Sequence, residues 1–187
     1  FATVISRHRR QLTLALNNRF FQYDEAMAMA DDDRNSTIAL NGLDDSRRAL
    51  LELLDGMRRT LYWYAPLVRS ELYNDPEVLA AIRSRVVTQP KVRLQLLLSP
   101  ARDWRNGCPG LVRLGERLTT ALNLRTPNRQ EMPDRPELGQ AFVIADERAL
   151  LHFTDPRRLL GVYEPRPTER MKELLELFHA VWNRAQV

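Results

Sequence analysis

Apolar and polar residues follow one another along this chain in a pattern that predicts short strands separated by amphipathic helices. Two apolar runs, residues 142–145 and 149–153, flank the polar tripeptide Asp146-Glu147-Arg148, and this spacing is typical of a β-hairpin. The first run is continuously apolar rather than alternating, which indicates a strand that is buried on both faces. We therefore expect the hairpin to lie in the middle of a β-sheet.

Further strands are predicted by other short apolar runs, of which the most regular alternates strictly; these are residues 37–40, 60–64, 91–98, 124–126 and 159–163. Helices are predicted where apolar residues recur every three or four positions. Asp75 followed by Pro76 is a strong helix start, and Phe178 and Trp182, four residues apart, mark the last helix. This alternation predicts an α/β fold in which a mixed β-sheet is sandwiched by helices.

The first part of the chain has a different character. Apolar residues recur at helical spacing over residues 1–30, and Asp31-Asp32-Asp33 then forms a polar break. We expect a helical extension with an acidic linker over residues 1–35, followed by the α/β domain. The apolar stripe of the extension fits packing on that domain or on a second copy of the chain. A homodimer would use this helix or the edge of the sheet.

Composition narrows the classes of function. The 187 residues are 44% hydrophobic and 28% charged, as in ordinary globular proteins. No apolar stretch approaches the roughly 18 residues of a membrane span, and together with the single cysteine this makes a cytoplasmic protein the expectation. Cys108 is the single cysteine, which argues against a disulfide or a cysteine-rich zinc site, and we expect no metal and no cofactor. Nearly all basic residues are arginines, which grip phosphate oxygens in pairs, but they are not concentrated in one run.

The predicted hairpin resembles that of the phospholipase D superfamily, which carries the motif His-x-Lys-x-x-x-x-Asp. Asp146 stands at the Asp position of this motif, and the apolar run before it also matches. Gly139 stands at the His position and Ala141 at the Lys position. The resemblance implies a single phospholipase D-like repeat over residues 36–187, in which the scaffold of the motif is present and its reactive side chains are missing.

In that family the His attacks phosphorus and the Lys holds the phosphate, while a second copy of the motif protonates the leaving group. Gly139 and Ala141 can supply neither function, and only one copy is present. Residues 152–155, which read His-Phe-Thr-Asp, also lack the small Gly-Ser-type segment of active members. The resemblance therefore implies a pseudoenzyme that works in binding or scaffolding, not an enzyme.

Three functions remain open. A phosphate-binding surface would use the basic residues that follow the alternating strand or surround the hairpin, which are Arg102, Arg105, Arg148, His152, Arg157 and Arg158. A nucleic-acid-binding module would stack Trp104 on a base, between Arg102 and Arg105. A phosphodiesterase with a relocated site would use His152 and Asp155, although a histidine on an apolar strand is more often structural. Asp146 has a structural explanation as well, because aspartates commonly bond the backbone of turns.

Overall fold

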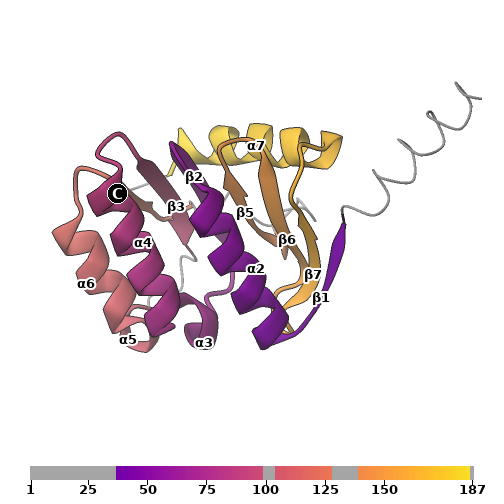
Figure 1. Cartoon of the computed structure of the whole chain (residues 1–187), viewed down its shortest axis with the longest axis horizontal. Coiled ribbons are helices and arrows are strands. Elements are labelled where there is room, and N and C mark those ends of the chain that lie inside the picture. Colours follow the sequence, from indigo (N-terminus) through magenta and orange to yellow (C-terminus); the bar gives the residue numbers. More distant parts are fainter. Residues whose placement is uncertain (1–36, 99–103, 128–138, 186–187) are drawn as a thin grey trace, which may run out of the picture. The chain divides into compact units, whose positions relative to one another are not determined.

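The structure is a computed structural model that describes residues 37–98, 104–127 and 139–185. The helical extension and linker expected over residues 1–35 lie outside this part of the chain. Seven strands form one sheet in the order β1-β7-β6-β5-β2-β3-β4 (Figure 1). The pairs β2–β3 and β3–β4 are parallel and the other neighbouring pairs are antiparallel. The mixed α/β fold expected from the sequence is thus confirmed.

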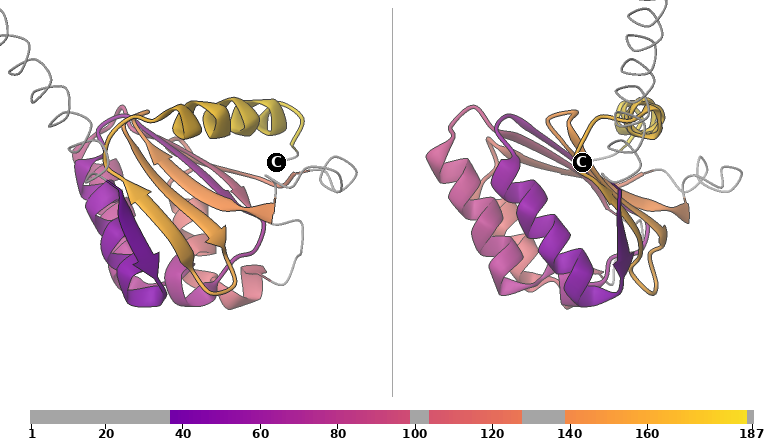
Figure 2. Two further views of the ribbon diagram at one scale, coloured as in Figure 1. Left: turned by 90° about the vertical axis from the view of Figure 1, so that its right-hand side faces the viewer. Right: turned by 45° about the vertical axis from the view of Figure 1, so that its right-hand side comes forward.

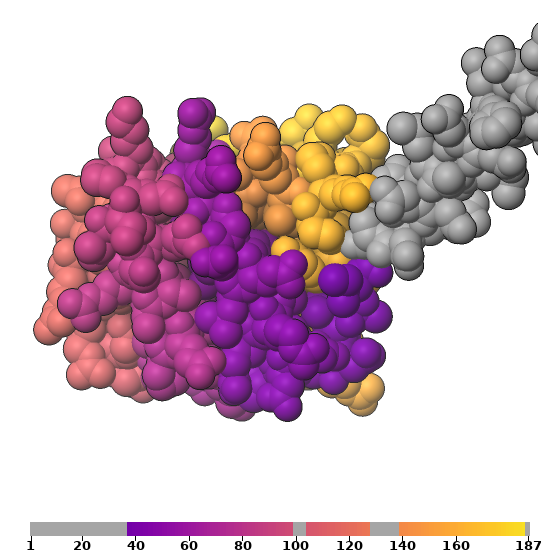
Figure 3. All heavy atoms as spheres, in the orientation of Figure 1, coloured from indigo at the N-terminus to yellow at the C-terminus, as the bar shows by residue number. Residues whose placement is uncertain are grey.

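The strands are β1 (Ile38–Asn41), β2 (Thr60–Ala65), β3 (Arg93–Leu98), β4 (Leu122–Arg125), β5 (Ala141–Ala145), β6 (Ala149–Asp155) and β7 (Leu160–Glu164). The helices are α2 (Leu43–Gly56), α3 (Ser70–Tyr73), α4 (Pro76–Thr88), α5 (Trp104–Gly107), α6 (Pro109–Arg117) and α7 (Glu169–Trp182). Helix α7 covers one face of the sheet, and α2, α4 and α6 cover the other (Figure 2). Helices α2, α4 and α6 form the near face of the space-filling view (Figure 3).

Buried side chains form two cores, one on each face of the sheet. The larger core joins the sheet to α2, α3, α4 and α6 and contains Leu50, Leu61, Trp63, Tyr73, Ile82 and Leu96. The smaller core joins the sheet to α7 and contains Tyr64, Phe142, Ile144, Phe178 and Trp182. Phe178 stacks on Trp182 with their ring centroids 5.6 Å apart. The last helix is therefore attached to the sheet by the two aromatic residues that its sequence predicts.

Helix starts follow the capping chemistry of the sequence. The Asp75 carboxylate accepts hydrogen bonds from the N–H groups of Glu77 and Val78, and Pro76 takes the first position of α4. The Thr168 hydroxyl accepts from the N–H of Met171 at the start of α7. Both caps satisfy N–H groups that have no partner inside the helix.

Two local expectations differ from the structure. The apolar spacing of residues 111–122 predicts one helix, but α6 ends at Arg117, and β4, which the sequence predicts from residue 124, begins at Leu122. Thr119 and Thr120 explain the early end, because β-branched residues favour strand over helix. The sequence predicts loops over residues 67–73 and 101–110, and the short helices α3 and α5 lie within these two segments.

The β5–β6 hairpin occupies the centre of the sheet, and this prediction is confirmed. Strand β5 is fourth of seven in the order, and all five of its residues are buried. The turn places Asp146 and Glu147 at φ angles of 52° and 56°, and the N–H of Arg148 donates to the carbonyl of Ala145 over 2.9 Å. Two consecutive left-handed residues give the turn a twist that matches the flanking strands.

Candidate functional site

Arginines gather at the two opposite ends of the strands of the sheet, and each of these ends is called an edge here. The β5–β6 hairpin runs from one to the other. One edge, here called the turn edge, contains the hairpin turn and the start of β2 and is defined by Arg58, Arg59 and Arg148. The other, here called the motif edge, contains the start of β5 and the end of β6 and is defined by Arg69, Arg105, Arg157 and Arg158. Strand β6 has seven residues and separates the two edges by about 20 Å.

This separation divides the basic residues that the sequence suggests for one anion site. Arg148 lies at the turn edge, whereas Arg157 and Arg158 follow β6 at the motif edge. Arg105 lies on α5, where Gly107 approaches Ser70 of α3. Arg102 lies outside the described residues. A single anion cannot contact both edges, so the expected set has to be read as two separate groups.

The positions that correspond to the His and Lys of the motif lie at the start of β5, beside the motif edge. Ala141 is buried and pairs with Phe153 of β6. Gly139 is exposed, and no atom lies within 4 Å of the place that a β-carbon would take there. A larger side chain at residue 139 would therefore have room, and this sequence supplies neither a nucleophile nor a cation at either position.

Asp146, at the Asp position of the motif, bonds to the backbone that leads into β2. Its carboxylate accepts three hydrogen bonds, from the N–H groups of Arg58 (2.6 Å), Arg59 (2.7 Å) and Thr60 (2.8 Å). The N–H of Asp146 in turn donates to the carbonyl of Thr60 over 3.0 Å. Asp146 therefore stabilises more than its own turn, because it fixes β2 against the hairpin.

His152 is held inside the fold on the α7 side of the sheet. Its neighbours Leu151 and Phe153 both belong to the core on the other side, and successive strand residues point in opposite directions. The side chain is 5% exposed, and its Nε2 atom lies 2.7 Å from Oε1 of Gln140. Within the described residues, Nδ1 has no hydrogen-bonding partner.

Burial lowers the pKa of His152, and the positive charge of Arg170 lowers it further. Glu164 acts in the opposite direction on this pKa, but its carboxylate is engaged by the Arg170 guanidinium at 2.9 Å and by the Thr168 hydroxyl at 2.6 Å. We therefore expect His152 to be uncharged at neutral pH.

Asp155, the partner suggested for His152 in a relocated catalytic site, closes the turn after β6. Its Oδ1 accepts hydrogen bonds from the N–H groups of Arg157 (3.0 Å) and Arg158 (3.2 Å). In the part of the chain that the structure describes, no hydrogen bond connects this carboxylate to His152. The contacts of both residues are those of structural groups.

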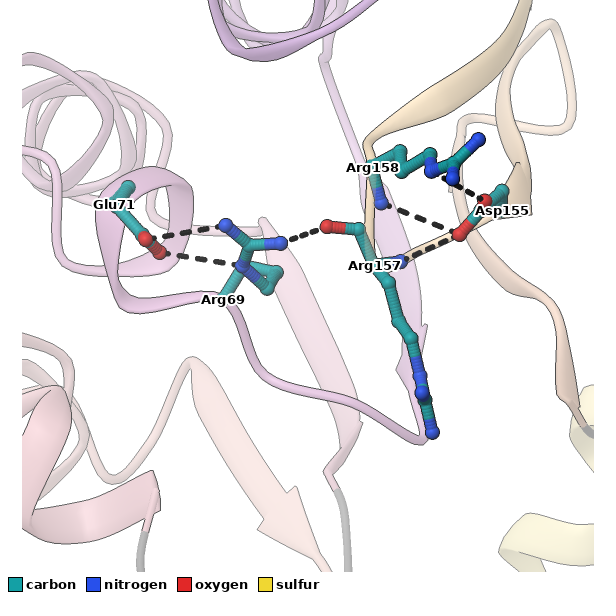
Figure 4. Close-up of polar contacts among 5 residues, drawn as sticks. All are labelled: Arg69, Glu71, Asp155, Arg157 and Arg158. Atoms are coloured by element: carbon teal, nitrogen blue, oxygen red, sulfur yellow. Dashed lines mark hydrogen bonds and ion pairs between the residues drawn. The ribbon is translucent and has the colours of Figure 1, made fainter.

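At the motif edge, the Arg69 side chain is held by two partners, whereas the Arg157 guanidinium extends without one among the residues drawn (Figure 4). Arg69 pairs with Glu71, with Nη2 3.1 Å from Oε1, and also donates to the backbone carbonyl of Arg157. Arg158 makes a loose pair with Asp155 at 3.9 Å. The Arg157 guanidinium points away from these groups, and it forms no ion pair or hydrogen bond within the described residues.

The stacking site suggested at Trp104 is mostly covered by protein. The side chain of Trp104 is 8% exposed and belongs to the larger core. The Arg105 guanidinium carbon lies 5.2 Å from the centroid of the Trp104 ring. A buried ring capped by an arginine leaves little surface for a nucleobase, so the suggested role of Trp104 is not the one that this packing favours.

At the turn edge, Arg58, Arg59 and Arg148 are all exposed and, together with Asp146, line a cavity of about 330 Å³. Among the described residues none of these arginines forms an ion pair. The Asp146 carboxylate in this cavity is already occupied by backbone N–H groups. Sequence reasoning missed Arg58 and Arg59 because the turn is remote from them in sequence; their one signal was two adjacent arginines directly before a strand.

The described residues show neither a metal site nor a membrane span. In residues 37–98, 104–127 and 139–185, no three His, Cys, Asp or Glu side chains are grouped so that they could hold a metal ion. Over the same residues, no helix combines the length and hydrophobicity that crossing a bilayer requires. Cys108 is free and buried, and burial raises the pKa of its thiol.

Comparisons with other proteins show a family and a similarity of fold. A family model described as a domain of unknown function, DUF7931, matches residues 42–187. No curated protein matches the chain. Among solved structures, the chain is similar to TrmBL2, an archaeal chromatin protein whose structure shows a novel mode of DNA binding. The TM-score is 0.54 and the identity 13%, over 97% of this chain and 67% of that chain. At this identity the similarity concerns the fold alone.

Proposed function

The chain belongs to the DUF7931 family of domains of unknown function, and we propose that it is a non-catalytic, phospholipase D-like domain that binds a phosphate-bearing ligand. The proposal is carried by the β5–β6 hairpin. The motif Asp of that hairpin is engaged by three backbone N–H groups, while the His and Lys positions hold Gly139 and Ala141. A hairpin with this geometry and without these side chains favours binding over phosphodiester chemistry.

The motif edge is the surface proposed to bind the ligand. Arg157 offers a guanidinium without an ion-pair partner in the described residues, and Arg158 is held only loosely by Asp155. Arg69 orders this turn by donating a hydrogen bond to the carbonyl of Arg157. A guanidinium presents paired N–H donors that fit phosphate oxygens, so the exposed arginines at this edge suit a phosphate group.

Binding of inorganic phosphate tests this proposal. In NMR spectra of the ¹⁵N-labelled chain, titration with phosphate should shift the backbone amides of Arg157 and Arg158 in a saturable way. The double variant Arg157→Glu/Arg158→Glu should lose this response, because it replaces both cations by anions. Arg48→Glu is the matched control, since Arg48 is an exposed arginine on α2. A response that is absent in the wild type, or equal in the double variant, would contradict the proposal.

A second candidate function is nucleic-acid binding, which the turn edge favours. Its three exposed arginines have no ion-pair partner among the described residues and line one cavity. The fold neighbour TrmBL2 is described as binding DNA, which adds support for this alternative at the level of the fold. Unpaired surface arginines are the groups that neutralise backbone phosphates.

A labelled DNA duplex tests the second candidate. Binding to the wild-type chain should weaken steeply as salt rises. In a plot of the logarithm of the binding constant against the logarithm of the salt concentration, Arg58→Glu/Arg59→Glu should reduce the steepness of the slope by roughly two. The double variant at the motif edge serves as the control, so the two candidate surfaces are separated in one experiment. Absence of binding at low salt would remove this candidate.

Two further expectations complete the proposal. We expect no phosphodiesterase activity, so any background rate with a chromogenic phosphodiester should be the same for the wild type and His152→Ala. A rate that His152→Ala abolishes would instead favour the relocated site.

The homodimer expected from the sequence also remains a prediction, which light scattering of the full chain checks directly.

A further inference from the structure

A groove of about 940 Å³ lies between α4 and α6, on the face of the sheet opposite α7. None of its lining residues belongs to either arginine-rich edge. Its apolar lining includes Leu79 and Val87 from α4 and Leu118 at the end of α6. Val87 is 68% exposed, which is high for a large aliphatic side chain. The groove therefore presents apolar surface to the solvent along two neighbouring helices.

The two helices touch closely at one end of the groove. A β-carbon at Gly110 of α6 would lie 2.5 Å from Cδ1 of Leu79 in α4, and the N–H of Gly110 donates over 2.7 Å to Oδ1 of Asn74, which follows α3 just before α4 begins. From this contact the lining continues to Val87 and Leu118 at the far ends of the two helices. The lining covers residues 79–87 of α4, so the groove runs for about 12 Å, which is a little over two helical turns.

The charged lining of this groove has one sign. Arg83 of α4 and Arg113 and Arg117 of α6 line it, and no lining residue is acidic. All three arginines are exposed, and none of them forms an ion pair within the described residues. Arg85, also on α4 but outside the groove, pairs with Asp55. Unpaired positive charge is thus a property of the groove rather than of the whole helix.

We propose that this groove docks an acidic amphipathic helix of a partner protein. An apolar floor of about two helical turns suits the apolar face of a short helix. Because Arg83 lies on one side and Arg113 and Arg117 on the other, carboxylates on both flanks of the docked helix would meet an arginine. A nucleic acid would satisfy the arginines but would leave Leu79, Val87 and Leu118 without an apolar contact.

A synthetic peptide tests this docking site. The probe is a fluorescent helical peptide of 13 residues, the length of α4, with leucines along one face and glutamates on both flanks. Two control peptides have lysines in place of the glutamates or the same composition in scrambled order. Binding to the full chain is measured by fluorescence anisotropy, and amide shifts in ¹⁵N spectra locate the peptide.

The acidic peptide should bind the wild type and shift amides of α4 and α6, whereas neither control peptide should bind. Arg83→Glu/Arg117→Glu should weaken binding by about tenfold or more, because each glutamate repels the carboxylates. Val87→Asp, at an exposed position, should also weaken it, since the apolar face of the peptide needs that surface. Arg48→Glu on α2 should leave the affinity unchanged.

Several results would overturn the proposal. They are absence of binding at millimolar peptide, equal binding of the lysine peptide, and an affinity that Arg83→Glu/Arg117→Glu does not change. Displacement of the peptide by duplex DNA, with loss of DNA binding in that same variant, would assign the groove to nucleic acid instead.

Discussion

At the scale of single residues, Asp146 connects the central hairpin to the strand beside it. Three backbone N–H groups at the start of β2 donate to its carboxylate, so the side chain replaces three hydrogen bonds that the sheet does not supply there. Hydrogen bonds to a charged acceptor are stronger than those between neutral groups. This residue therefore contributes to stability whether or not the domain has a ligand.

We expect Asp146→Ala to lower the free energy of unfolding by roughly 3 kcal/mol, because it leaves three donors without their acceptor. Alanine also tolerates the left-handed backbone of this position poorly. Asp146→Asn should cost less, since asparagine keeps one acceptor and adopts φ values of this sign readily. Urea unfolding followed by circular dichroism measures the difference, and equal stability of Asp146→Ala and the wild type would contradict the assigned role.

His152 should make stability depend on pH. Its pKa in the folded protein lies below the ordinary value of 6.5. Between these two pKa values the unfolded chain has the His152 ring protonated, whereas the folded chain has it neutral. The contribution of His152 to the free energy of unfolding is therefore fully present above about pH 6.5, and it is lost as the pH falls toward the pKa of the folded protein.

Thermal unfolding between about pH 7.5 and pH 5.5 should therefore lower the melting temperature of the wild type more than that of His152→Gln, which has no titrating ring. His179→Gln provides the control, because His179 is exposed on α7. Parallel curves for the wild type and His152→Gln would show that the His152 ring does not control this pH dependence.

At the scale of elements, the pairing of β6 with β7 depends on a close approach of their backbones. The register shifts between Phe153 and Asp155, and Gly161 lies opposite Phe153. A β-carbon at residue 161 would lie 2.0 Å from the carbonyl oxygen of His152 and 2.8 Å from Cα of Phe153. Backbone atoms cannot move aside as flexible side-chain ends do, so only glycine fits here.

We predict that Gly161→Ala lowers the free energy of unfolding by roughly 3 kcal/mol, at the upper end of overpacking effects. Gly56→Ala is the matched control, because a β-carbon at residue 56 meets no atom within 4 Å. That control should be neutral or slightly stabilising, since alanine favours helix over glycine. The midpoints of denaturant unfolding for the two variants give the comparison, and similar midpoints would refute the packing argument.

At the scale of the whole molecule, the two cores of the described residues are built from the first strand onward. The earliest core residue is Leu40, and the latest is Trp182 at the end of α7. We expect a fragment of residues 36–187 to unfold cooperatively, with a melting temperature within a few degrees of the full chain. Differential scanning calorimetry checks this, and a fragment without a cooperative transition would place part of the core upstream.

The sequence predicted those features that depend on local pattern. The hairpin, its central position, the cap at Asp75 and the aromatic pair Phe178 and Trp182 can all be read from residue order and spacing. Features that depend on distant pairing could not be predicted. Strand order decides that Arg148 and Arg157 lie at opposite edges, and the backbone N–H groups that occupy Asp146 come from a strand remote in sequence. Burial of Trp104 likewise follows from packing that its neighbours in sequence do not reveal.

The hydrogen bonds of Asp146 also bear on how such a sequence changes over generations. If the chain descends from an active phospholipase D-like domain, as proposed, its lineage no longer selects for a nucleophile at residue 139 or a cation at residue 141. It does not lose the need for an acceptor at residue 146, because β2 depends on it. The motif should therefore decay unevenly, with its aspartate last to disappear. An aspartate that survives in such a hairpin is explained by its part in folding, and by itself it does not identify an active relative.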